Sequence, residues 1–221
     1  MAWGRIAHTA GVWSALGLWV AMSLPAQAVE IQSRDALDGQ RASIEARMVS
    51  QWALAAGKVR GRPFAIVDKR DARIFVFGAD GRLAGAAPVL LGEARGDSSA
   101  PGVARRVTSG IVPQERTTPA GRFESEPGHN DKGEAIVWVD YGAAVAIHRL
   151  RPAPAFERRP ERLASETADD NRISLGCIVV SEAFFDQVIA PTLGRQRGVV
   201  YVLPETRSTE AEFGIEPAEL L

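Results

Sequence analysis

The stretch FAIVDKRDARIFVF, residues Phe64–Phe77, decides the fold of this 221-residue chain. Two runs of β-branched and aromatic residues flank the charged tripeptide KRD, a pattern that predicts two strands joined by a turn. A third apolar run, Leu83–Leu91, follows the turn GADG, so residues 64–91 are expected to form a β-meander. Further strands are expected at Arg122–Glu124, Ala135–Tyr141, Ala143–Ile147 and Gly198–Pro204. The chain is therefore predicted to be mainly β.

Two helices are expected beside these strands. Ser33–Lys58 carries apolar side chains at spacings of three and four among charges, which predicts an N-terminal amphipathic helix used for packing or linkage. Glu182–Ile189, preceded by the capping residue Ser181, predicts a short second helix. The stretch Gly92–Pro119 is rich in glycine, proline and charge, so it is expected to be a long loop beside a site. Thr206–Leu221 is expected to be a loose tail.

The first residues have the features of a secretory signal peptide. Arg5 and His8 precede an apolar stretch, Ala10–Leu24, and a small-x-small pattern follows at Ala26 and Ala28. The apolar stretch is shorter than the roughly 20 residues that cross a bilayer as a helix. Cleavage after Ala28 is therefore favoured over an uncleaved membrane anchor. We expect export to the periplasm, with no membrane contact after cleavage.

Charge and composition argue against several classes of function. The 26 basic and 27 acidic side chains give a formal net charge of −1, which does not favour a nucleic-acid partner. After signal cleavage two histidines and one cysteine remain at no ligand-like spacing, and no glycine-rich phosphate loop is present. We therefore expect neither a metal nor another cofactor. A lone cysteine in an exported chain is buried and inert, paired between chains, or reactive.

That cysteine lies in RISLGCIVV, residues Arg172–Val180, where a polar turn runs through a glycine into an apolar strand. A strand end fixes the backbone, and a glycine lets a substrate approach backbone N–H groups. A free thiol is only about 3% ionised at pH 7, so a nucleophilic Cys177 needs a base. His148 ends the apolar strand Ala143–Ile147 and is the expected base. His129 lies in a turn-rich segment and is expected at the surface.

These residues resemble the L,D-transpeptidase family with its YkuD-type catalytic domain. The family motif runs from a strand-end histidine to Ser/Thr-His-Gly-Cys-hydrophobic-Asn, and here His148 is followed by SLGCIV at Ser174–Val179. The segment TPAGRF, Thr118–Phe123, is similar to the family's T-P-x-G-x-F. The resemblance covers about residues 62–205 and implies an L,D-transpeptidase-type β-sandwich with one or two short helices. The expected organisation is a signal peptide at 1–28, a helical segment at 29–61, the catalytic domain at 62–205 and a tail at 206–221.

The resemblance also implies a reaction. Cys177 would attack the bond between an L-centre and D-alanine in a peptidoglycan stem tetrapeptide and release D-alanine. His148 would be its general base, oriented by the backbone carbonyl of Arg149. The N–H groups of Gly176 and Cys177 would stabilise the oxyanion, next to Ser174 at the start of the motif. The thioester would pass to an amine of a neighbouring stem or of an envelope lipoprotein, or to water, which would make the enzyme a carboxypeptidase.

A carboxylate on the stem peptide needs a cationic partner. Arg172, next to the predicted cleft, is expected to bind it, because a guanidinium pairs bidentately with a carboxylate. The arginines of the segment Arg149–Asn171 are a second candidate. The alternative for that segment is a solvated surface in which arginines and acidic residues pair with one another.

Three features depart from the family pattern. Leu175 stands where the family has histidine, and Val179 where it has asparagine. In addition, 25 residues separate His148 from Ser174, a longer span than is usual. The base and the oxyanion donors do not depend on the two lost side chains, so activity is expected in weakened form. Two alternatives stay open: a catalytically silent module that binds peptidoglycan, and a structural protein in which Cys177 is buried as a small hydrophobe.

Overall fold

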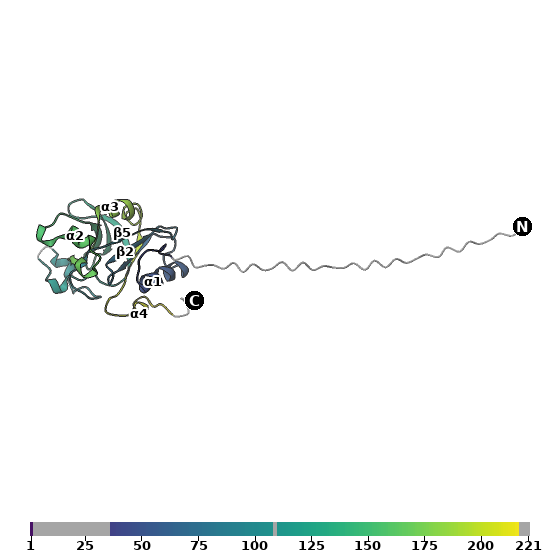
Figure 1. The fold of residues 1–221 in the computed structure, drawn as a ribbon, viewed down its shortest axis with the longest axis horizontal. Helices are drawn as coiled ribbons and strands as arrows, with labels where there is room; N and C mark the ends of the chain where they lie inside the picture. The colour runs from purple at the N-terminus through teal and green to yellow at the C-terminus, as the bar shows by residue number, and fades with distance from the viewer. Residues whose placement is uncertain (2–35, 108–109, 217–221) are drawn as a thin grey trace. The chain divides into compact units, whose positions relative to one another are not determined.

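The computed structural model describes residues 1, 36–107 and 110–216. By its internal contacts the chain divides into Met1–Gln32 and Ser33–Leu221, and every described helix and strand lies in the second unit (Figure 1). The predicted signal peptide lies outside the described residues, apart from Met1. Within the described ranges, no helix is both long and apolar enough to span a bilayer.

Strands make up most of the regular structure. They are β1 (Phe64–Asp68), β2 (Arg73–Phe77), β3 (Leu83–Pro88), β4 (Leu91–Gly92), β5 (Gly121–His129), β6 (Ala135–Asp140), β7 (Val145–Arg149), β8 (Arg172–Ser174), β9 (Ile178–Val180) and β10 (Gly198–Val202). Eight of them form one sheet in the order β3-β2-β1-β10-β5-β6-β7-β9, and β4 pairs separately with β8. The stretch FAIVDKRDARIFVF forms the antiparallel hairpin β1–β2, in register from Phe64↔Phe77 to Asp68↔Arg73. The mainly β prediction is confirmed.

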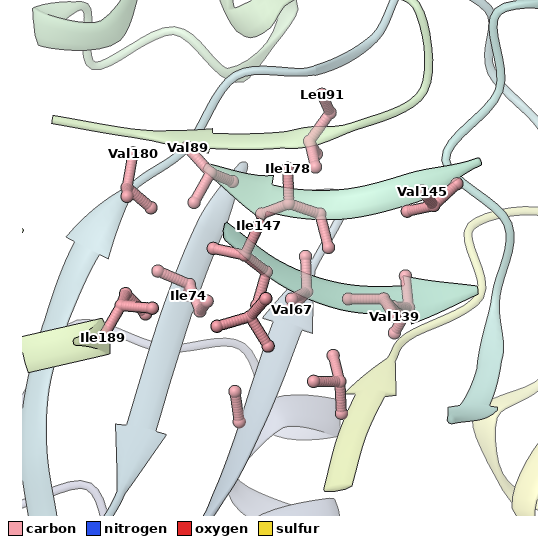
Figure 2. Close-up of a cluster of buried hydrophobic side chains, with 14 of the residues drawn as sticks. Val67, Ile74, Val89, Leu91, Val139, Val145, Ile147, Ile178, Val180 and Ile189 are labelled. Carbon is pink, nitrogen blue, oxygen red and sulfur yellow. The ribbon is translucent and has the colours of Figure 1, made fainter. Parts of the chain in front are cut away.

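The sheet curls around its main core instead of forming two separate sheets. Ile74 of β2 and Ile178 of β9 lie near opposite ends of the strand order, yet both belong to one buried cluster with Val67, Val139 and Ile147 (Figure 2). Strands so far apart in a flat sheet could not share a core, because neighbouring strands are about 4.8 Å apart. The two layers expected of a sandwich are therefore parts of one continuous sheet.

A second core lies on the other face of β1, β2 and β10. There α1 (Ile44–Ala55) packs Trp52 against Tyr201, with ring centroids 6.0 Å apart. The Ser43 hydroxyl caps α1 by accepting the Ala46 N–H at 3.0 Å. The helix is shorter than the predicted Ser33–Lys58, and Leu37 lies in a turn before it, fully buried.

Residues 206–216, the described part of the predicted loose tail, pack onto this second core, which corrects that expectation for them. A short helix, α4 (Thr209–Phe213), is capped by Ser208, and Figure 1 shows it close to α1. The Phe213 ring lies edge-on to Tyr201 at 5.5 Å and 6.4 Å from Trp52. The segment is ordered because it buries this aromatic ring against partners far away in the sequence.

Short helical segments fill the remaining connections. They are η1 (Val103–Arg106), η2 (Pro113–Glu115), η3 (Ala155–Glu157), α2 (Arg159–Ala164), η4 (Ala168–Asn171), α3 (Glu182–Phe184) and the π-helical turn η5 (Phe185–Ile189). The predicted second helix is thus α3 together with η5. The charged segment between β7 and β8 folds into η3, α2 and η4.

Candidate active site

The parallel pair β7–β9 brings His148 and Cys177 to one face of the sheet. Ile147 is in register with Ile178, and His148 with Val179. Side chains of residues in register lie on the same face, and side chains alternate along a strand. Cys177, two residues before Val179, therefore shares the outer face with His148, while Ile147 and Ile178 fill the core. Among the described residues, no hydrogen bond joins the imidazole to the thiol.

The His148 ring is held by its own backbone neighbour. Its Nδ1 lies 2.7 Å from the Arg149 carbonyl oxygen, the group that the resemblance assigns to this contact. A carbonyl only accepts, so Nδ1 carries the proton and Nε2 keeps its lone pair. The Arg149 side chain points elsewhere, donating from Nε to Asp186 at 2.9 Å. His148 is therefore held in the tautomer that a general base at Nε2 requires.

Burial sets the charge state of both reacting groups. It lowers the pKa of His148 to about 4, and the guanidinium groups of Arg151 and Arg159 act in the same direction. Burial also raises the pKa of the Cys177 thiol, whose Sγ donates to the Ala144 carbonyl at 3.6 Å. At neutral pH the pair is thus a neutral thiol and a neutral imidazole, and not a preformed thiolate and imidazolium.

A tight turn presents the thiol. The Ser174 hydroxyl donates to the Cys177 carbonyl at 2.6 Å and accepts the Gly176 N–H at 3.1 Å. Gly176 has φ +131°, and a Cβ there would lie 2.9 Å from the Thr117 carbonyl oxygen, so only glycine fits. The predicted oxyanion role of the Gly176 N–H is corrected, because Ser174 already occupies that donor. Within the described part of the chain, the Cys177 N–H donates to no acceptor, so it is the available oxyanion donor.

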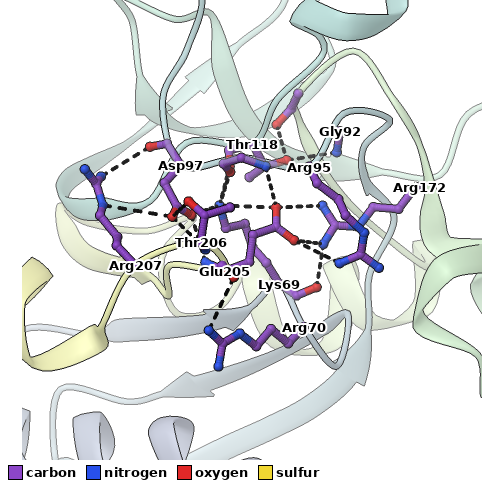
Figure 3. Close-up of polar contacts among 12 residues, drawn as sticks. Lys69, Arg70, Gly92, Arg95, Asp97, Thr118, Arg172, Glu205, Thr206 and Arg207 are labelled. Carbon is purple, nitrogen blue, oxygen red and sulfur yellow. Dashed lines mark hydrogen bonds and ion pairs between the residues drawn. The ribbon is translucent and has the colours of Figure 1, made fainter.

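Arg172 lies in a buried ion-pair cluster and not in the substrate site. It is only 9% exposed, donates to the Lys69 carbonyl at 2.8 Å, and pairs with Glu205 at 2.6 Å (Figure 3). A buried carboxylate needs a cation, and Arg172 supplies one to Glu205. This placement corrects the prediction that Arg172 binds substrate. The sequence could not have revealed it, because the partner lies 33 residues away.

The structure links two of the departures from the family motif. Val179, at the asparagine position, is fully buried in an apolar cluster with Leu90 and Leu163. Leu163 comes from α2, which belongs to the long segment between His148 and Ser174. The additional residues thus cover the apolar side chain that replaces the asparagine. Leu175, at the histidine position, is 43% exposed on the turn.

A groove begins at His148 and continues along the inserted segment. Its first part, about 320 Å³, is lined by His148, Arg151 and Glu182 among others. The second part, about 470 Å³, shares Arg151 and Glu182 and adds Arg158. Arg151 Nε lies 2.9 Å from the carboxylate of Glu134, which also lines the first part of the groove. Among the described residues, Arg158 has no ion-pair partner. Sequence analysis identified these arginines only as a group, since nothing in their spacing says which ones face the groove.

Metal ligation has no support in the described ranges, where no cluster of three or more His, Cys, Asp or Glu side chains could hold an ion. His129 lies at the exposed end of β5.

No protein-family model and no curated protein sequence matches this chain. Solved structures match at low identity. They include the helical cell shape determining protein Pgp2 from Campylobacter jejuni (15% identity, TM-score 0.45, covering 66% of this chain and 49% of that one). They also include an L,D-transpeptidase from Mycobacterium smegmatis (17% identity, TM-score 0.35, covering 64% of this chain and 58% of that one). The catalytic domain of the E. faecium L,D-transpeptidase matches as well (18% identity, TM-score 0.35, covering 65% of this chain and 98% of that one). The chain spans about half the length of Pgp2.

Proposed function

We propose that this protein is a cysteine acyltransferase of the L,D-transpeptidase type, acting on the stem peptides of peptidoglycan. The observation that carries the proposal is the 2.7 Å contact of His148 Nδ1 with the Arg149 carbonyl. This contact leaves Nε2 of His148 unprotonated. His148 lies on β7, which pairs with β9, and the only cysteine of the sequence directly precedes β9. The motif resemblance supplies the substrate class.

The reaction follows from the two neutral groups. As Sγ of Cys177 attacks the amide carbonyl carbon, Nε2 of His148 takes the thiol proton, and the Cys177 N–H stabilises the negative charge on oxygen. The imidazolium then protonates the leaving amine of D-alanine as the C–N bond breaks. A thioester remains on Cys177, and an amine or a water molecule attacks it with His148 again taking the proton.

The groove offers the contacts for the rest of the stem peptide. Arg151 and Arg158 present guanidinium groups along it, and these suit the carboxylates of a stem peptide. We therefore assign carboxylate binding to this groove instead of to Arg172. The proposal includes export to the periplasm, with residues 1–28 removed, and catalytic residues within 62–205.

Turnover of a stem tetrapeptide tests the function. The purified protein is expected to release D-alanine, measured by liquid chromatography and mass spectrometry, and Cys177→Ala is expected to release none. A crosslinked dimer when a second stem is added would identify a transpeptidase, and a tripeptide alone would identify a carboxypeptidase. An envelope lipoprotein with a free lysine is the third acceptor to test.

The silent binding module is the competing function, and the raised pKa of the thiol and the exposed Leu175 favour it. It predicts no release of D-alanine from any stem. It also predicts that folded protein binds purified sacculi equally well with and without Cys177→Ala.

A further inference from the structure

A buried threonine holds the backbone next to the nucleophile. Thr118 is fully buried, its hydroxyl donates to the Gly176 carbonyl at 2.9 Å, and it accepts the Gly92 N–H at 2.9 Å. Both hydrogen bonds of the hydroxyl are therefore used. Thr118 starts the TPAGRF segment that the motif comparison identified, but neither the proposed mechanism nor the groove uses this residue.

The Thr118 backbone is itself anchored. Its carbonyl accepts from the ammonium group of Lys69 at 3.0 Å. Lys69 is fully buried and also donates to Asp97 at 2.8 Å, with Glu205 3.6 Å away (Figure 3). A buried ammonium group without these partners would be strongly unfavourable. Lys69 therefore has to keep its contacts with Asp97, Glu205 and the Thr118 carbonyl. Thr118 is therefore fixed in position by groups outside the active site.

Close packing leaves the segment no freedom to shift. A Cβ at Gly92 would lie 2.2 Å from the Arg116 carbonyl oxygen, and one at Gly176 would lie 2.9 Å from the Thr117 carbonyl oxygen. Residues 116–118 thus lie directly against backbone on both sides. The Thr118 hydroxyl is held where it meets the Gly176 carbonyl.

The geometry points to Thr118 as a positioning residue for the oxyanion donor. The Gly176 carbonyl and the Cys177 N–H belong to one planar peptide group and point in opposite directions. Fixing the carbonyl therefore fixes the direction of the N–H that stabilises the oxyanion. We infer that Thr118 sets the efficiency of acylation without changing the reactivity of the thiol itself. This inference rests on the proposed function.

Two reagents separate these effects on Cys177. Acylation by imipenem, a carbapenem, forms an oxyanion, whereas alkylation by iodoacetamide displaces iodide and forms none. For Thr118→Val, which keeps the shape but removes the hydroxyl, we expect acylation to slow by about tenfold to a hundredfold. We expect alkylation to stay within about twofold, since it does not depend on the oxyanion donor. Thr118→Ser, which keeps the hydroxyl, is expected to restore acylation.

The outcomes distinguish this inference from the function on which it rests. Equal slowing of both reactions in Thr118→Val, or no slowing of acylation, would overturn the inference while leaving the function intact. A wild-type protein that is alkylated but never acylated would overturn both. If Thr118→Val does not fold, Thr118→Ala serves in its place, because a water molecule can satisfy Gly92 and Gly176 without fixing the carbonyl.

Discussion

His148 is neutral in the folded protein, and this makes stability depend on pH. Burial lowers its pKa from 6.5 to about 4, so between these values the folded state binds fewer protons than the unfolded state. The free energy of unfolding is therefore expected to fall as the pH drops from 6.5 towards 4. His148→Gln is expected to show a shallower fall, measured by urea unfolding across this range. Parallel curves for the two proteins would show that His148 is not held neutral.

Arg151 and Arg172 are expected to behave in opposite ways. Arg151→Ala should raise KM for a stem tetrapeptide by about tenfold and leave stability nearly unchanged, because its pair with Glu134 is partly exposed. Arg172→Met should leave KM unchanged and lower the free energy of unfolding by about 3 kcal/mol, because Glu205 loses a buried partner. Steady-state kinetics and urea unfolding of both variants test this pair. A stable Arg172→Met with a raised KM would return Arg172 to the substrate site.

The helix α2 packs over Val179 through Leu163. Val179→Asn introduces the asparagine of the L,D-transpeptidase motif that this sequence resembles, but it places an amide in the cluster of Leu90 and Leu163. We expect it to lower the free energy of unfolding by about 2–4 kcal/mol without faster acylation by imipenem. Val179→Ala, which removes volume without adding a polar group, is the matched control. A Val179→Asn variant as stable as wild type, or faster in acylation, would show that α2 does not close over this position.

The strands could be predicted from the sequence because their signal is local. Alternation and β-branched residues mark β1, β2, β6, β7 and β10 in the sequence, and they place His148 towards the end of a strand. The fold of the segment between β7 and β8 was not predictable. Its charges mask Leu163, the buried apolar side chain through which α2 packs.

Contacts between distant parts of the chain decide the features that the sequence does not predict. The buried position of Arg172 is not predictable from the sequence, because Glu205 and Lys69 meet it only in the folded protein. The packing of residues 206–216 is not predictable either, because Phe213 contacts its aromatic partners only when the distant parts of the chain have folded together. Local patterns therefore predict elements and candidate chemistry, whereas buried ion pairs and distant packing need the three-dimensional structure.

The proposed mechanism requires the neutral imidazole of His148 to take the proton of the neutral Cys177 thiol. The most direct test is intact-mass spectrometry of the protein with imipenem, in parallel with Cys177→Ala and His148→Gln. We expect a complete adduct on the wild type, none on Cys177→Ala, and formation slowed by about a hundredfold or more on His148→Gln. A folded wild-type protein without an adduct, or an adduct that forms equally fast on His148→Gln, would contradict this mechanism.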